Sequence, residues 1–251
     1  NIVIVSALTS GQGITLSWAN TSGDSTLVSN NMVSITSASG GQTIGLYTVN
    51  SRNLHFYYNS IHVISGFSSS SRSLYSTGTT TGGNKLVNNI LVNRTGGLGA
   101  YISAPLNFSL LDHNAYYLPN SSSFGFFGAA VPDLAAWRII TNQEGNSLVG
   151  DPGFQSDSIL IPSSVGVNNH GMPLSSVPYD IFGTARDTSF PDIGAIEYDP
   201  ASFDMHMLAW DAPTGGNCYY SGNENVVAAV INNSFIPHTG FVLSYSTDGG
   251  I

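Results

Sequence analysis

The chain has 251 residues, a formal net charge of −9 at pH 7 and only 8% charged residues, whereas glycine alone occupies 28 positions. This composition is poor in residues that favour helices and rich in residues that form turns, which favours an all-β protein. The six Lys and Arg residues are scattered along the chain. This excludes a nucleic-acid-binding surface, because phosphate binding requires clustered positive charge.

The two ends of the chain and its single cysteine bear on where the protein works. No apolar run approaches the roughly 18 residues that span a bilayer, and no signal peptide opens the chain. Cys218 is the only cysteine, so an internal disulfide is impossible. The first residues, NIVIVSAL, read as the inside of a strand, and FVLSYSTDGGI ends just after another strand. We therefore expect a piece of a longer exported polypeptide, with signal and sorting segments elsewhere.

A repeat runs through residues 1–118. Four similar segments begin at Asn30, Asn59, Asn88 and Asn114, and subtraction gives steps of 29, 29 and 26 residues. Each repeat contains two further short stretches of strand-like composition, separated by Gly, Ser, Thr or Asn. They predict strands at 13–18, 43–49, 72–77 and 99–104, and at 25–28, 53–58, 84–87 and 108–111. Three short strands per coil predict a right-handed parallel β-helix, in which successive coils lie about 4.8 Å apart.

The repeated asparagines are expected to stack at one corner of this β-helix. Asn tolerates the left-handed backbone that a corner requires, and its amide can bond to the coils above and below. We therefore predict a structural ladder formed by Asn59, Asn88 and Asn114. A row of ligand-binding amides is the alternative.

Beyond residue 120 the repeat fades. The segment PDLAAWRII is the best helical candidate, with Pro132 in the first turn and Asp133 beside it. A loop-rich stretch then leads to FPDIGAIEYDP, residues 190–200, which is acidic in a chain that is poor in charge. On an extended strand, Asp192 and Glu197 would face opposite sides, and Glu197 and Asp199 would share one.

This closing stretch resembles a known family. The succession N-S-x-x-x-D-P-x-F, a Pro- and Gly-rich stretch and then PDIGAIEY is similar to the C-terminal end of secreted right-handed β-helix proteins of the pectate-lyase-like superfamily. More narrowly, it resembles Bacteroidota surface proteins whose helix closes with a DxGAxE motif. The match covers residues 10–199 and is carried by Asn146, Asp151, Pro152, Phe154, Arg186, Asp192, Gly194, Ala195 and Glu197. The resemblance implies the fold and an extracellular setting, but no single reaction.

The charged residues of this match are expected to close the β-helix. A carboxylate beside Arg186 would pin the closing loop by a bidentate pair. We therefore assign structural closure to Asp151, Arg186, Asp192 and Glu197. Calcium binding and catalysis are the alternatives for these acids.

A second module is expected after Asp199-Pro200. The segments MHMLAWDAP, ENVVAAVINNS and GFVLSYSTDGG read as three antiparallel strands and resemble the opening of an immunoglobulin-like adhesion module. Three strands cannot close a sandwich. We therefore predict a β-helix over residues 1–199 and an incomplete immunoglobulin-like β-sandwich over residues 200–251. Asp199 and Asp204 are candidates for a calcium site at the junction.

The sequence lacks the catalytic residues that this superfamily uses. Pectate lyases need calcium-binding Asp residues that face a Lys or Arg base, and polygalacturonases need paired Asp residues near His and Arg-x-Lys. Residues 1–118 contain only Asp24 and Asp112 as acids. Asp112 and His113 are adjacent, so on a strand they would point to opposite faces. The sequence leans toward a protein that is not an enzyme, although segments outside this chain could complete an active site.

Aromatic residues are the better functional lead. In RNLHFYYNSIHV, residues 52–63, we expect Arg52, His55 and Tyr57 on one face, where Tyr and His beside Arg can bind sugar rings. Tyr47, Tyr75 and Tyr101 recur at intervals of 28 and 26 residues and would extend this face into a stripe. Stacked aromatics that only stabilise neighbouring coils are the alternative.

Two short motifs concern modification. Asp24-Ser25-Thr26 and Asp157-Ser158-Ile159 resemble the sequon at which Bacteroidota glycosylate exported proteins. Ser25 and Ser158 are therefore candidate O-glycosylation sites.

The leading hypothesis is a non-catalytic β-helix module of a large exported cell-surface protein that acts as an adhesin or stalk. Its expected ligand is a polysaccharide or surface glycan, and calcium is the one cofactor considered. Such a protein resembles cargo of the type IX secretion pathway, so secretion or outer-membrane components are expected partners. The rival hypotheses are a polysaccharide lyase or glycosidase, and an architectural spacer without a ligand.

Overall fold

The computed structural model describes residues 1–19, 23–64, 68–78, 82–198, 205–212 and 226–232. The chain divides into two compact units, Asn1–Tyr198 and Asp199–Ile251. In the second unit, β17 (Met205–Ala212) pairs antiparallel with β18 (Val227–Asn232). The third strand that we predicted there lies outside the described residues. The sandwich therefore stays a prediction.

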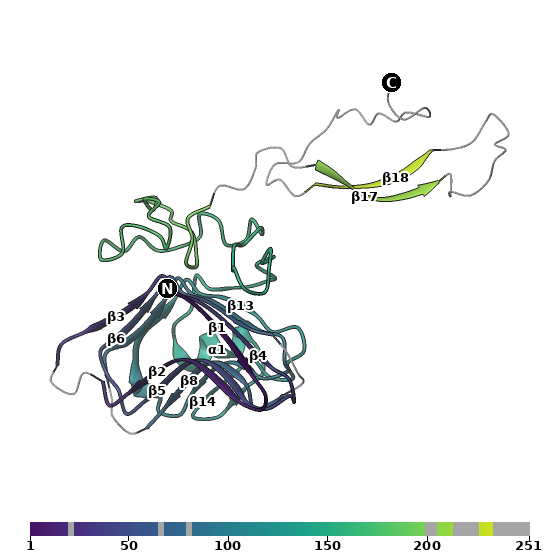
Figure 1. The fold of residues 1–251 in the computed structure, drawn as a ribbon. Helices are drawn as coiled ribbons and strands as arrows, with labels where there is room; N and C mark the ends of the chain where they lie inside the picture. Colours follow the sequence, from purple (N-terminus) through teal and green to yellow (C-terminus); the bar gives the residue numbers. More distant parts are fainter. Residues whose placement is uncertain (20–22, 65–67, 79–81, 199–204, 213–225, 233–251) are drawn as a thin grey trace. The chain divides into compact units, whose positions relative to one another are not determined.

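The first unit is a parallel β-solenoid with three sheets (Figure 1). Sheet A contains β1 (Ile2–Ala7), β4 (Met32–Ser37), β7 (Ser60–Val63), β10 (Ile90–Asn93), β13 (Ala115–Tyr117) and β16 (Leu148–Val149). Sheet B contains β2 (Gly11–Ser17), β5 (Thr43–Val49), β8 (Arg72–Thr77), β11 (Leu98–Ile102), β14 (Gly125–Phe127) and the antiparallel β15 (Ala130–Val131). Sheet C contains β3 (Thr26–Ser29), β6 (Leu54–Tyr57), β9 (Asn84–Val87) and β12 (Phe108–Asp112), which follows a short 3₁₀ turn at Pro105–Asn107. The all-β class and the parallel β-helix are confirmed.

The strand register stacks like residues inside the solenoid. Ile61 pairs with Val33 on one side and Leu91 on the other, and all three side chains are fully buried. On sheet B the chain approaches this core closely, because a Cβ added at Gly45 would lie only 2.2 Å from the Cγ2 atom of Ile61. A side chain at Gly45 would therefore clash with the aliphatic stack, so this position of sheet B requires glycine.

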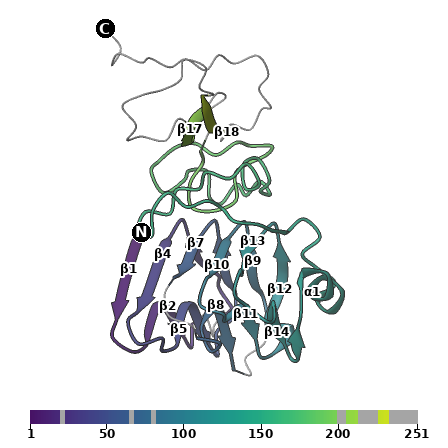
Figure 2. The same cartoon turned by 90° about the vertical axis from the view of Figure 1, so that its right-hand side faces the viewer.

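Helix α1 (Leu134–Thr141) closes the core at one end of the solenoid (Figure 2). Its Trp137 is fully buried, and the Trp137 ring lies 5.6 Å from the Phe124 ring and 5.5 Å from the Phe127 ring. The predicted helix is confirmed, but its start is corrected. Asp133 is the N-cap, its side chain accepting from the Ala136 amide at 2.8 Å, so Pro132 precedes the helix rather than lying in its first turn. No helix in the described part of the chain is long and apolar enough to cross a membrane.

Residues 151–198 form a loop-rich strap, here called the covering segment, over the outer face of sheet A (Figures 1 and 2). Val167 and Ile193 of this segment pack on Ile90, Val92 and Ala115. Farther along the sheet, Leu160, Ala195 and Ile196 pack on Met32. The PDIGAIEY stretch is therefore part of a hydrophobic lid rather than a strand of the solenoid.

Candidate ligand-binding surfaces

A buried row of amides runs along one corner of the solenoid. Asn31 donates to the Oδ1 atom of Asn59, Asn59 to that of Asn89, and Asn89 to that of Asn114, each from both the backbone amide and Nδ2 at 2.8–3.2 Å. Asn59, Asn89 and Asn114 are fully buried. Because every side chain is engaged within the row, these amides hold the coils together and are closed to a ligand.

Asn88 does not belong to this row, which corrects the predicted ladder. Asn88 lies one residue before it, at a corner with a left-handed φ of 60°. Its side chain turns outward, donating to the Met172 carbonyl at 2.7 Å and accepting from the Met172 amide at 2.8 Å. Asn88 therefore fastens the covering segment to the solenoid.

The amide row ends on a buried acid that the sequence analysis missed. Glu144 is fully buried and accepts from the Tyr116 hydroxyl at 2.7 Å, from Nδ2 of Asn114 and from the Ser147 hydroxyl. Burial raises the pKa of this carboxyl, and the three donors oppose that rise. A lone Glu in a loop gave no sequence signal for this role.

The closing motif forms one network around Arg186, which is only 7% exposed. Its Nη1 atom lies 3.2 Å from Oε2 of Glu197, and its Nη2 atom donates to Asn30 Oδ1 and to the Gly194 carbonyl. The guanidinium also lies over the Tyr58 ring, 3.8 Å from its centroid. The ion pair lies within the covering segment, and the bond to Asn30 and the contact with the Tyr58 ring join that segment to the solenoid.

Asp192 lies in the same network, although the strand argument had placed it opposite Glu197. The motif is not a strand, because Gly194 has a φ of +104° and turns the chain. Oε2 of Glu197 therefore accepts from the Asp192 amide at 3.1 Å. The Asp192 carboxyl accepts from the amides of Asn169 and Tyr198, and burial, opposed by these bonds, raises its pKa to about 7.

Asp151 lies apart from this network. It faces Arg94 at 3.5 Å in an exposed ion pair, and it accepts from the Gly153 amide. Beneath it, His62 is 1% exposed, and its Nε2 accepts from Nε of Arg94 at 3.2 Å. Burial, with the Arg94 charge as a second cause, lowers the pKa of His62 to about 4. The covering segment thus has a second attachment point on sheet A.

Asp112 and His113 lie closer together than strand geometry predicted. His113 is a corner residue with a φ of 53°, so its ring turns back to within 3.2 Å of the Asp112 carboxylate. The contact lacks hydrogen-bond geometry. Asp112 instead accepts from the backbone amide and Nδ2 of Asn146; burial acts to raise its pKa, but these hydrogen bonds help to lower it overall. This acid fastens a loop.

The predicted sugar-binding face on sheet C is largely closed. Tyr57, which we expected to be exposed, is 6% exposed and belongs to a buried cluster that includes Val177 of the covering segment. The His55 ring lies 5.3 Å from the Tyr57 ring, and burial and Lys85 lower the pKa of His55. Arg52 precedes β6 and is half-buried. The periodicity of β6 gave no sign of the loop that covers it.

The open aromatic surface lies on sheet B instead. Tyr47, Tyr75, Tyr101 and Phe126, here called the aromatic row, come from β5, β8, β11 and β14 and are half-buried. Successive ring centroids lie 5.1, 4.9 and 4.4 Å apart. The row therefore does not extend the Tyr57 face, and it includes Phe126, which the sequence analysis missed.

One cation accompanies the aromatic row. The Arg72 guanidinium lies 5.6 Å from the centroid of the Tyr101 ring, and Arg72 is the only charged residue in the six strands of sheet B. Its Nη1 atom donates to the carbonyls of Ser69 and Ser71. These bonds hold the side chain across the sheet, where it can meet a ligand on the row.

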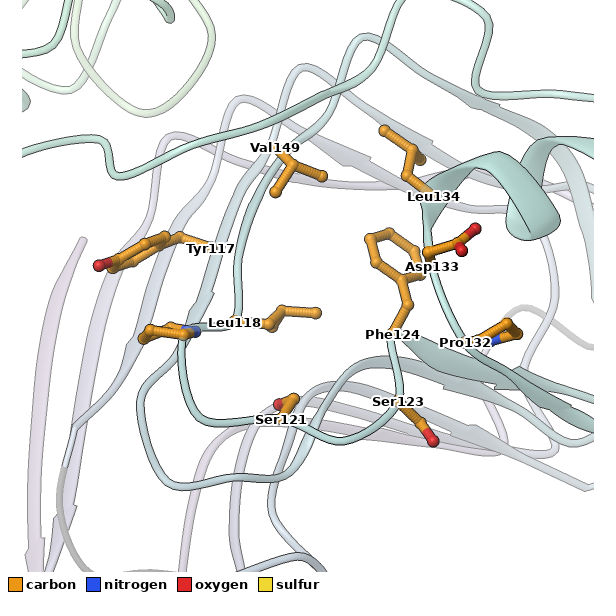
Figure 3. A pocket seen from close by; sticks show the side chains of 10 residues that line it. Tyr117, Leu118, Ser121, Ser123, Phe124, Pro132, Asp133, Leu134 and Val149 are labelled. Atoms are coloured by element: carbon orange, nitrogen blue, oxygen red, sulfur yellow. The ribbon is translucent and has the colours of Figure 1, made fainter.

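A separate apolar pocket of about 270 Å³ lies where α1 begins. Figure 3 shows Leu118 and Phe124 reaching into it, with Tyr117 and Val149 at its wall. Asp133 is its one charged lining residue, and that carboxylate already caps α1. The pocket can therefore hold an apolar group, but it has few polar groups that could select one ligand over another.

The modification candidates differ in access, and the described residues contain no group of three or more His, Cys, Asp or Glu side chains placed to hold a metal ion. Ser25 is exposed just before β3, and Ser158 is half-buried in the covering segment. Asp199 and Asp204 lie outside the described residues. The calcium site and both glycosylation sites stay predictions.

These features define an all-β protein built around a parallel β-solenoid, in which residues 151–198 cover sheet A and the described residues leave the aromatic row of sheet B partly exposed. Comparison with family models, with curated proteins and with solved structures found no match to this chain.

Proposed function

We propose that this chain is a non-catalytic β-helix module of an exported cell-surface protein, an adhesin or stalk that binds polysaccharide along the aromatic row. The carrying observation is the row itself, four half-buried rings at 4.4–5.1 Å spacing on a bare sheet with Arg72 as the only strand charge. Tyr presents an apolar body and a hydroxyl, which suits the apolar faces and hydroxyls of sugars.

The geometry of the row favours a polymer over a single sugar. Tyr47 and Tyr75 are stacked at 13°, and Tyr101 and Phe126 at 6°, so the two rings of each pair cover each other's faces, whereas Tyr75 meets Tyr101 edge-on at 77°. A ligand then meets ring edges that repeat from coil to coil, together with the hydroxyls of the three Tyr residues. Each contact is weak, and a polysaccharide that spans several coils gains affinity because it makes these contacts together.

The acids of the closing motif support a non-catalytic reading. Glu197 is engaged by Arg186 and by the Asp187 and Asp192 amides. Asp192 is 1% exposed and bonded to two amides. Carboxylates occupied in this way hold a loop rather than transfer protons to a substrate.

The finer assignment rests on sequence resemblance. The N-S-x-x-x-D-P-x-F and PDIGAIEY stretches support a β-helix of pectate-lyase-like type from a Bacteroidota surface protein exported by type IX secretion. The strands after residue 200 support an immunoglobulin-like neighbour. Localisation of the full-length protein by surface proteolysis of intact cells tests the exported setting, and complete protection would contradict it.

Polysaccharide binding is tested by affinity electrophoresis of the whole chain through gels that contain neutral or acidic polysaccharides. We expect retardation that Tyr75→Ala reduces and that the matched control Tyr179→Ala, an exposed Tyr of the covering segment, preserves. No retardation in any gel would leave only the spacer. New reducing or unsaturated ends, with or without calcium, would instead establish the lyase or glycosidase.

A further inference from the structure

The chemistry of the aromatic row changes along the solenoid axis. Strand register places Thr15 of β2 beside Tyr47, in line with the row. Thr15, Tyr47, Tyr75 and Tyr101 therefore carry hydroxyls on four successive coils, and Phe126 follows them without one. Figure 2 shows their strands, β2, β5, β8, β11 and β14, in order along the solenoid. The line of hydroxyls thus runs along the axis and stops before the last coil of sheet B.

These hydroxyls are available to a ligand. Thr15 is exposed and the three Tyr residues are half-buried. Among the described residues, no group forms a hydrogen bond with the hydroxyls of Tyr47, Tyr75 or Tyr101. The Thr15 hydroxyl donates to Oε1 of Gln12 at 2.9 Å, but its oxygen can still accept. Each of the four coils can therefore offer one hydrogen bond to a molecule that lies on the row.

The spacing of the coils restricts which polymer can use all four hydroxyls. Neighbouring strands lie about 4.8 Å apart, and the ring centroids of the row lie 4.4–5.1 Å apart. A pyranose that is linked through opposite ring carbons spans roughly 5 Å, by the sum of ordinary bond lengths. An extended polymer of such units therefore presents one sugar to each coil. A polymer that coils advances less per unit and loses this match after a few contacts.

We propose that the row binds an extended β-1,4-linked pyranose polymer that lies parallel to the solenoid axis, with one sugar unit on each of the four hydroxyl-bearing coils. Each hydroxyl bonds to one sugar unit, and the bonds end at Phe126. This inference rests on the proposed polysaccharide binding and adds the linkage, the direction and the bound length of the ligand.

The test is an NMR titration of the whole chain with β-1,4-linked oligosaccharides of glucose, mannose or N-acetylglucosamine, from the disaccharide to the hexasaccharide. We expect at least one series to gain about three- to tenfold in affinity per unit up to the tetrasaccharide and little beyond it. The α-1,4-linked glucose series has the same monomer but coils, so it should bind at least about tenfold more weakly.

Two variants test the match of one sugar to one coil. Phe126→Tyr adds a hydroxyl on the next coil and should move the plateau to the pentasaccharide. Tyr75→Phe removes only a hydroxyl, so it should weaken tetrasaccharide binding about three- to tenfold without changing the free energy of unfolding. Tyr179→Phe, at an exposed Tyr of the covering segment, is the matched control and should bind like the parent.

The outcomes separate this inference from the proposed function. Affinity that is independent of length, equal binding of the α-linked series, or an unmoved plateau in Phe126→Tyr would each overturn the inference. If polysaccharide gels still retard the chain, the proposed function stands without it. Absence of binding in the gels and in all three β-linked series would remove both.

Discussion

The outer faces of sheets A and B are built on the same solenoid but carry opposite chemistry. Sheet A presents Met32, Ile90, Val92 and Ala115, all at most 1% exposed beneath the covering segment. Sheet B presents the half-buried aromatic row. Burial stabilises an aliphatic side chain by removing it from water, whereas a half-buried Tyr can keep its hydroxyl in contact with water.

This difference shows how the chain separates stability from recognition. The covering segment over sheet A, called the lid below, has little regular structure. Its position therefore depends on side-chain anchors: the Asn88 bonds, the Arg186 network and the Ile193 contact. The aromatic row needs no lid, because β-sheet hydrogen bonds already fix its spacing. Mutations should therefore destabilise the chain strongly on sheet A and weakly on sheet B.

The largest effect is expected from Arg186→Met. Removing the cation leaves the partly buried Glu197 carboxylate without its ion-pair partner and frees the Asn30 and Gly194 acceptors, which should cost about 3–5 kcal/mol of unfolding free energy. Asp151→Asn is the control, since the Arg94–Asp151 pair is exposed and should contribute about 0–1 kcal/mol. Urea denaturation measures both, and equal losses would show that the buried network does not hold the lid.

A smaller loss is expected from Ile193→Ala. Ile193 is fully buried between the lid and sheet A, so its truncation should cost about 2–4 kcal/mol through lost burial and a cavity. Val149→Ala, at a 60% exposed position of β16, should change stability by less than about 0.5 kcal/mol. If hydrogen exchange of residues 151–198 stays as slow in Ile193→Ala as in the parent, this contact is not an anchor of the lid.

The solenoid was predictable because its signals are local and repeated. Strand-length apolar stretches at a regular interval suffice for a parallel β-helix, and Asp133 followed by an apolar run suffices for α1. Asn59 and Asn114 belong to the observed row, but Asn88 was misplaced by one residue because corner and ladder positions are adjacent and both favour Asn. In the doublets Asn30-Asn31 and Asn88-Asn89, sequence alone does not say which residue turns inward.

The covered surfaces could not be predicted in the same way. Tyr57 alternates as an exposed residue should, yet it lies in a buried cluster that includes Val177, from a loop more than 100 residues later. The network of Asp192 and Glu197 depends on the turn at Gly194, which strand parity cannot represent. Contacts made by irregular loops leave no periodic trace in the sequence.

Acid should weaken the lid through His62. Its pKa is about 4 in the folded chain and about 6.5 when unfolded, so the unfolded chain binds more protons between these values. The contribution of neutral His62 to the free energy of unfolding is almost fully present above about pH 6.5 and decreases as the pH drops toward 4. At about pH 5.5 the loss should be roughly 1–2 kcal/mol.

A His62→Gln variant separates the titration of His62 from the titration of the buried acids. The pKa values of Glu144 and Asp192 are raised, so both groups act in the opposite sense and gain stability for the fold as the pH falls. The difference in unfolding free energy between parent and variant, measured from pH 7 to pH 5, cancels their contribution. A difference that does not change with pH would contradict the assignment to His62.

The smallest effect on stability is expected at the centre of the bare sheet. Tyr75→Ala removes one stacked and one edge-on aromatic contact from a half-buried position, which should cost about 0.5–1.5 kcal/mol beyond the area lost. The loss should be below that of Ile193→Ala in the same urea series, and exchange in residues 151–198 should not change. A loss as large as that of Ile193→Ala would mean that the aromatic row stabilises the coils as much as the lid does. The absence of a lid from sheet B would then no longer indicate a surface kept open for a ligand.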